Sequence, residues 1–242
     1  MARDVSILEA VSAGGSPPTI RIYGWSPPCL SLGRHQPIEA ADVDFCRNHG
    51  IDVVRRPTGG RAVLHQHELT YSVVAPLGVG PIPRPLQDAY RTLCSALNQA
   101  ARRLGVNSEL TDGEVNLELP GPRSVVPCFK APAAGEIVVC GRKLIGSSMR
   151  AHNGHILQHG AILLDWDGDL QAGAVGLEDD RGLRGFVTTF KDELGHIPSR
   201  KALEQALAGA FGDELSVALH PALLSPDEET AAEHSTAEFT VV

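Results

Sequence analysis

Two strand-like runs joined by a turn with two consecutive glycines most constrain how this chain can fold. Residues 51–56 (IDVVRR) and 61–76 (RAVLHQHELTYSVVAP) are rich in β-branched residues, which favours strands, and Pro-Thr-Gly-Gly at 57–60 joins them. The two halves of 61–76 suggest paired or bent strands, and several of the strands expected along the chain follow one another as hairpins, whose strands pair antiparallel. We therefore expect a sheet that is largely antiparallel rather than a doubly wound parallel sheet.

The rest of the chain alternates further strands with amphipathic helices. Strands are expected at 20–25, 28–33, 155–165 and 214–220, with a hairpin at 136–148 that turns at Cys140-Gly141. Helices are expected at 4–12, 42–50 and 86–104, and after an N-cap at Ser199. This pattern predicts the α+β class, with one domain over 1–225 and a terminal helix or frayed acidic tail over 226–242.

Composition excludes several function classes. The chain has 29 acidic and 21 basic residues, a formal net charge of −8, which argues against sequence-independent binding of nucleic acid. It has no stretch of the ~20 apolar residues that would cross a bilayer. The first residues lack the apolar core of a signal peptide, so we expect a cytoplasmic protein that does not bind membranes.

The five cysteines are odd in number and form no CxxC pair, so neither a structural zinc site nor a disulfide framework is expected. Cys128 lies in a proline-rich stretch, where its thiol would be accessible, and Lys143 follows it on the predicted hairpin. A cation beside a thiol lowers the pKa of the thiol and makes it a better nucleophile. From the residues alone, a loop cysteine and an unrelated surface lysine remain the alternative.

The glycine-containing turn and the histidines are two further candidates. Glycines at 59 and 60, surrounded by arginines at 55, 56 and 61, would let backbone N–H groups approach a ligand, although an ordinary solvated turn has the same composition. His152, His155 and His159 fall within one short segment. No acidic residue is interleaved and the segment reads as a strand, so we expect no metal site. Polar positions on a pocket-facing strand would explain His65 and His67 equally well.

Four motifs taken together are more specific than any one of them. They are RRPTGGRAVLHQHELTYSV, CF-x-A-P, GRK-L-I-GS and ILQHGAILLD. In combination they resemble the biotin/lipoate protein ligase superfamily and, within it, the octanoyltransferases of the LipM type. The resemblance extends from the first helix to about residue 220.

The resemblance implies a fold, a reaction and a set of site residues. The fold would be that of a biotin protein ligase or lipoate ligase catalytic domain, with a curved sheet flanked by helices. The enzyme, expected to be a monomer without a cofactor, would move an octanoyl group from acyl carrier protein to a lysine of a lipoyl-accepting protein, the glycine cleavage H-protein. Cys128 would carry the acyl thioester and Lys143 would lower its pKa. The implied substrate-binding residues are Arg55, Arg56, Thr58, Gly59, Gly60, Arg61, Ala62, His65, Gly146, Ser147, His159 and Gly160.

Two other functions stay open at this point. A lipoate–protein ligase, which activates free lipoate with ATP, would share the glycine-containing turn and the lysine but would not need Cys128. A non-catalytic module that binds acyl chains or carrier proteins is the second alternative. Replacement of Cys128 by serine would separate the transferase from the ligase.

Overall fold

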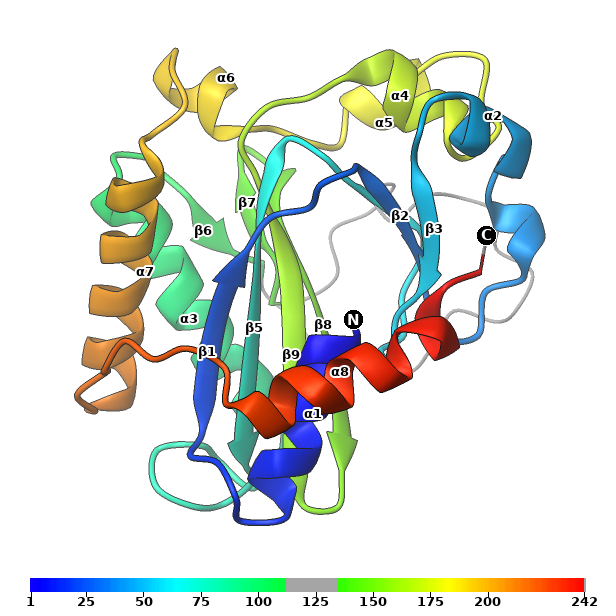
Figure 1. Cartoon of the computed structure of the whole chain (residues 1–242). Coiled ribbons are helices and arrows are strands. Elements are labelled where there is room, and N and C mark those ends of the chain that lie inside the picture. The colour runs from blue at the N-terminus through cyan, green and yellow to red at the C-terminus, as the bar shows by residue number, and fades with distance from the viewer. Residues whose placement is uncertain (112–134, 242) are drawn as a thin grey trace.

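The structure is a computed structural model that describes residues 1–111 and 135–241 of the chain. Within these residues a six-stranded sheet has the order β1-β5-β9-β8-β7-β6, and all its neighbouring strands are antiparallel (Figure 1). Its strands are β1 (Thr19–Tyr23), β5 (Glu68–Pro76), β6 (Glu109–Leu110), β7 (Ile137–Val139), β8 (Arg142–His152) and β9 (His155–Leu163). The expectation of a largely antiparallel sheet in an α+β fold is confirmed.

A second, smaller sheet lies beside the first and has the order β3-β2-β4. Its strands are β2 (Cys29–Leu32), β3 (Asp52–Arg55) and β4 (Val63–His65). Strand β2 pairs parallel with β3 and antiparallel with β4. The two halves of 61–76 do form separate strands, but they do not pair with each other, because β4 belongs to the small sheet and β5 to the large one. The strands on either side of the glycine-containing turn, β3 and β4, do not pair either, since β2 lies between them.

The helices cover the sheets from several sides. They are α1 (Ala2–Ser12), α2 (Val43–Asn48), α3 (Leu86–Arg103), α4 (Gly168–Gly173), α5 (Arg181–Arg184), α6 (Phe190–Leu194), α7 (Arg200–Leu215) and α8 (Pro226–Phe239), with a 3-10 turn at Ile38–Ala40. None of them, in the part of the chain that the structure describes, has both the length and the apolar character needed to traverse a bilayer.

The two faces of the large sheet are covered by different helices (Figure 1). Successive side chains of a strand point to opposite faces. One face, which includes Tyr71 and Ile162, packs against α3 and α7 in the main hydrophobic core. On the other face Val74 and Leu157 pack against Ile7 of α1. We call this second face the α1 face.

Helix α3 forms where the spacing of apolar residues predicts it. Leu93, Leu97 and Ala101 recur every three or four residues and are almost completely buried, so one stripe of the helix faces the core. Burial of a leucine side chain contributes about 1.5–3 kcal/mol. Leu207 and Phe211 of α7 lie in the same core.

The strand expected at 214–220 is wrong. Helix α7 continues to Leu215 and ends at Ser216, which adopts a left-handed conformation with φ 52°. Leu215 is buried in the main core one turn after Phe211, and the Glu214 carboxylate accepts a hydrogen bond of 3.0 Å from Ser95 of α3. Packing at the helical period therefore prevails over the strand-like composition of this segment.

Candidate functional site

The glycine turn, residues 57–61, lies between β3 and β4 and is held in shape by Arg56. The Arg56 guanidinium donates from Nη2 to the carbonyl oxygens of Gly59 and Arg61, both at 2.7 Å. Its Nη1 donates to the carbonyl oxygen of Ser31 at 2.8 Å. Because Arg56 is 5% exposed and these contacts go to backbone carbonyls, its guanidinium organises the turn from inside.

Glycines allow this turn to pack against the end of β2. Gly60 has a φ of 88°, which favours glycine, and a Cβ on Gly33 would lie only 1.9 Å from the carbonyl oxygen of Gly60. Arg55 fastens the same corner, since its Nη1 donates to the carbonyl oxygens of Gly33, at 3.1 Å, and of Gln36. Ala62, the residue after the turn, is buried in the core of the small sheet.

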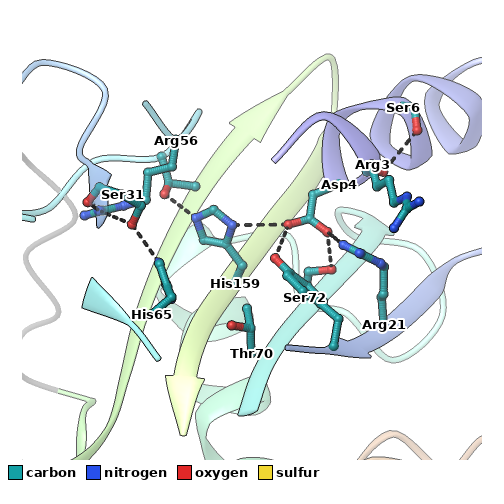
Figure 2. Close-up of polar contacts among 12 residues, drawn as sticks. Arg3, Asp4, Ser6, Arg21, Ser31, Arg56, His65, Thr70, Ser72 and His159 are labelled. Carbon is teal, nitrogen blue, oxygen red and sulfur yellow. Dashed lines mark hydrogen bonds and ion pairs between the residues drawn. The ribbon is translucent and has the colours of Figure 1, made fainter. Parts of the chain in front are cut away.

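A line of buried polar groups connects the glycine turn to α1 through His159 (Figure 2). Thr58 Oγ1 lies 2.5 Å from His159 Nε2, and His159 Nδ1 lies 3.5 Å from Asp4 Oδ2. Asp4 also accepts hydrogen bonds from Arg21, at 2.7 Å, and Ser72, at 2.9 Å. Thr58 and Asp4 have no exposed surface, so the line is sealed from solvent at both ends.

Burial and charge decide the protonation states along this line. Burial alone would raise the pKa of Asp4, but the hydrogen bond from His159 and the charge of Arg21 hold that pKa well below its usual value. Burial lowers the pKa of His159 below 6.5, and the opposing effect of Asp4 does not reverse this. A neutral His159 therefore accepts a hydrogen bond from the Thr58 hydroxyl at Nε2 and directs its Nδ1–H toward the Asp4 carboxylate.

His159 is expected to make the fold less stable in mild acid. Its pKa is lower in the folded state, so its contribution to the free energy of unfolding is complete above 6.5 and is lost as the pH falls below that value. The slope from this one group is at most about 1.4 kcal/mol for each pH unit. Urea denaturation between pH 7 and pH 5 should therefore show a weaker pH dependence for His159→Gln than for the wild type.

The control for this prediction is His155→Gln, which lies on the same strand but at the β8–β9 turn, where its Nδ1 contacts a backbone oxygen. This variant should keep the wild-type pH dependence. Identical slopes for His159→Gln and the wild type would show that His159 does not titrate as its burial requires.

A second polar line starts at His65 and runs toward the large sheet. His65 Nε2 lies 2.7 Å from Ser31 Oγ, and His65 Nδ1 lies 2.6 Å from Glu68 Oε1. Glu68 also accepts a hydrogen bond from Thr70, whose Oγ1 in turn accepts one of 2.8 Å from the indole of Trp25. The indole stacks on the His65 ring, with centroids 4.7 Å apart. His65 therefore joins the small sheet to β5.

A β-bulge determines where Lys143 points. Ile137 pairs with Ile145, whereas the next β7 residue, Val138, pairs with Lys143, so Leu144 is the extra residue of β8. Leu144 and Ile145 both belong to the main core. Lys143 is therefore turned to the α1 face, and its Cδ would lie 3.5 Å from a Cβ on Gly146. Without the bulge, its alternation with Ile145 would place it in the core.

Lys143 forms a buried ion pair with Glu136. Its Nζ lies 2.6 Å from Glu136 Oε1, and the two side chains are 2% and 8% exposed. Glu136 is held in turn by Thr111, because its backbone N–H donates to Thr111 Oγ1 at 3.0 Å. Gly135 donates to the Thr111 carbonyl oxygen at 2.9 Å. Cys128, the expected nucleophile, lies outside the described residues.

The other cysteines differ in how they could react. Cys29, Cys46 and Cys94 are buried, and burial raises the pKa of Cys29 and of Cys94 to about 12. Such thiols are inert at neutral pH. Cys140 is exposed and lies at the β7–β8 turn that the sequence predicts, with a φ of 49°.

The remaining predicted residues lie on β8 and β9. Gly146 and Ser147 are within the β8–β9 ladder, where Ser147 pairs with Gly160, and Ser147 Oγ accepts a hydrogen bond of 2.7 Å from Tyr71. Ser148 points to the α1 face and donates to the carbonyl oxygen of Gly59 at 3.1 Å. The glycine turn, β8 and His159 are thus brought together, while Ala62 is not part of this group.

Sequence reasoning missed several residues of the polar lines and the ion pair, among them Asp4, Ser31, Glu68 and Glu136. Each is an ordinary polar residue in sequence, and only the fold gives it a buried partner. In the described ranges, 1–111 and 135–241, no group of three or more His, Cys, Asp or Glu side chains could hold a metal ion.

The sequence of this chain is similar to a known family and to known proteins. The model of the family described as the lipoyl protein ligase A/B catalytic domain matches residues 1–212. The octanoyltransferase LipM of Kyrpidia tusciae is 37% identical to this chain in an alignment that covers 99% of this chain and 90% of the relative. That of Geobacillus kaustophilus is also 37% identical, with 96% of this chain and 87% of the relative covered.

Solved structures share the fold at lower sequence identity. A crystal structure of lipoate-protein ligase A bound with ATP superimposes with a TM-score of 0.77 at 21% identity, covering 98% of this chain and 90% of the other. The putative lipoate protein ligase Ta0514 of T. acidophilum with bound lipoic acid gives a TM-score of 0.75 at 23% identity, with 98% and 89% covered. The expected lipoate ligase-like fold is confirmed.

Proposed function

Because this chain belongs to the lipoyl protein ligase A/B catalytic domain family and is matched along almost its whole length by octanoyltransferases, we propose that it transfers octanoyl groups through a thioester on Cys128. Octanoyl transfer in lipoate biosynthesis is the activity of this group. The donor in our proposal is octanoyl-acyl carrier protein, and the acceptor is a lysine of a lipoyl-accepting protein, the glycine cleavage H-protein.

The proposed reaction has two steps and needs no ATP. In the first, the Cys128 thiolate attacks the carbonyl carbon of the donor thioester, and the thiol of the carrier arm leaves. In the second, the neutral amine of the acceptor lysine attacks the Cys128 thioester, an amide forms, and the Cys128 thiol is released. Exchange between thioesters is close to neutral in free energy, and formation of the amide is downhill.

Lys143 and Glu136 support the chemistry of Cys128 in this proposal. An ammonium group next to a thiol favours the thiolate, and it also stabilises the oxyanion that develops at the attacked carbonyl. Glu136, 2.6 Å from Lys143 Nζ, compensates the cost of burying that ammonium and holds it in place. The observation that carries the proposal is that the bulge turns Lys143 to the α1 face, beside Gly146 and away from the main core.

The glycine turn and its neighbours complete the proposed binding site. Thr58, Gly59 and Gly60 would line the path of the acyl group and the carrier arm, and a backbone N–H group near Gly146 and Ser147 would serve as an oxyanion donor. The Thr58–His159–Asp4 line supports this role, because it fixes the turn against the sheet without exposing the imidazole.

Intact-mass analysis after mixing with octanoyl-acyl carrier protein tests the thioester. The wild type should gain the mass of one octanoyl group, Cys128→Ser should gain none and should transfer none to H-protein, and Cys140→Ser should behave as the wild type. Cys140 is the matched control because its thiol is exposed and distant in sequence from the proposed nucleophile.

The alternatives are separated by the same experiment. An adduct that persists in Cys128→Ser and disappears in Cys140→Ser would contradict the assignment of the nucleophile. If Cys128→Ser lipoylates H-protein when supplied with lipoate and ATP, the chain is a ligase. If the wild type formed no adduct and transferred no octanoyl group, the result would favour a non-catalytic module that binds acyl chains or carrier proteins.

A further inference from the structure

Two arginines flank the outer side of the glycine turn and contact consecutive carbonyl groups of it. Arg34, two residues after the end of β2, donates its backbone N–H to the Thr58 carbonyl oxygen at 2.9 Å. Arg150 of β8 donates from Nη1 to the Pro57 carbonyl oxygen at 3.4 Å. The Arg34 side chain is exposed and that of Arg150 is half-buried.

Neither guanidinium has an acidic partner among the residues that the structure describes. Burial and then the positive charge of Arg34 lower the pKa of Arg150, so the two charges are close enough to repel. Within residues 1–111 and 135–241, Arg150 Nε is buried without a hydrogen-bond partner, and Nη2 contacts the His152 ring nitrogen at 3.4 Å. A pair of like charges with unused donors is stabilised by an anion.

Three other arginines near the turn are already engaged. Arg56 binds carbonyl oxygens inside the turn, and Arg55 binds those of Gly33 and Gln36. Arg142, at the other end of β8, pairs with Glu193 at 3.0 Å. Arg34 and Arg150 therefore differ from these three, because their guanidinium groups keep N–H donors that no described residue engages.

Arg150 lies on the same strand and the same face as the proposed catalytic lysine. It pairs with Leu157, which packs under α1, so its side chain starts from the α1 face, as that of Lys143 does. The strand between them spans roughly 20 Å at ~3.3 Å per residue. On the α1 face this span carries the small residues Gly146 and Ser148.

We infer that Arg34 and Arg150 form a receptor for the phosphodiester of the phosphopantetheine arm on which an acyl carrier protein presents its thioester. This inference rests on the proposed function. The arm has one anionic group at one end and the thioester at the other. In the same way, β8 has Lys143 near one end and Arg150 near the other, where Arg34 lies beside it at the glycine turn. Guanidinium groups bind phosphate through two parallel hydrogen bonds, which fixes the position of the arm as well as its charge.

Calorimetric titration with 4′-phosphopantetheine and with pantetheine tests the receptor without any acyl transfer. The wild type should bind the phosphorylated compound at least tenfold more tightly. Arg34→Gln and Arg150→Gln should each reduce the ratio of the two affinities, 4′-phosphopantetheine over pantetheine, to less than threefold. The affinity for pantetheine itself should be unchanged. Arg47→Gln is the control, because Arg47 is a surface arginine of α2 paired with Asp44 and should keep the wild-type ratio.

The outcomes distinguish this inference from the proposed function. The inference that these arginines bind the phosphate would be contradicted if the wild type bound the two compounds with equal affinity. It would also be contradicted if Arg150→Gln kept the wild-type ratio of affinities. If the variants weaken binding of the whole carrier protein but leave the ratio intact, the arginines bind acidic residues on the carrier surface instead. Failure of octanoyl-phosphopantetheine to acylate Cys128, with the ratio as expected, would overturn the thioester mechanism and leave the receptor in place.

Discussion

Replacing Lys143 by methionine is expected to lower the free energy of unfolding by about 3–5 kcal/mol and to abolish octanoyl transfer. The stability loss follows from Glu136, whose side chain is 8% exposed and would lose the ammonium 2.6 Å away. The loss of transfer follows from the proposed role of that ammonium beside the Cys128 thiol. Urea denaturation measures the first effect, and the rate at which the Cys128 adduct forms measures the second.

A double variant separates these two effects. In Glu136→Gln/Lys143→Met both charges are removed, and replacing a buried ion pair by neutral groups of similar size is often close to neutral for stability. We expect stability to return to near the wild-type value while transfer stays absent. Lys191→Met, which removes a lysine whose side chain is 55% exposed, should change neither quantity appreciably. Wild-type transfer by the double variant would show that Lys143 has a structural role only.

Gly160→Ala is expected to destabilise the protein by about 3 kcal/mol, because the added methyl group has no space between two strands. Its Cβ would lie 2.1 Å from the carbonyl oxygen of Gly146 and 2.8 Å from the Tyr71 ring. A backbone oxygen within a sheet cannot move aside as a flexible side chain can. The midpoint of urea denaturation measures the cost.

Gly182→Ala is the matched control for this substitution. Gly182 lies in α5, its φ is not positive, and nothing lies within 4 Å of an added Cβ. Alanine favours helix over glycine, so this variant should be as stable as the wild type or slightly more stable. If Gly160→Ala were equally harmless, β8 and β9 would have to be able to separate locally, contrary to their close approach at Gly146.

The parts of the fold that depend on local patterns were predictable from the sequence. The apolar stripe of α3, the serine that caps α7 and the Cys140-Gly141 turn all depend on residues close together in the chain. The strand expected at 214–220 was wrong because Leu215 is buried against the main core, which is a contact between distant segments. Local composition does not contain that information.

The same distinction applies to the site. The glycine turn and Lys143 could be identified from their residue types. The orientation of Lys143, however, depends on a β-bulge against β7 that the local sequence does not predict. Asp4 reads in sequence as an ordinary acidic residue in the first turn of a helix. Its importance becomes visible only when β9 brings His159 beside it.

The Thr58–His159–Asp4 line also bears on how the protein acquires its activity. Its members come from the first helix, from a turn in the first third of the chain and from the last strand of the large sheet. Contacts of such large sequence separation form only after the intervening chain has been ordered, at a considerable cost in loop entropy. A properly anchored glycine turn is therefore a property of the complete tertiary structure. A nascent chain in which β9 has not yet been synthesised lacks the imidazole that anchors this turn.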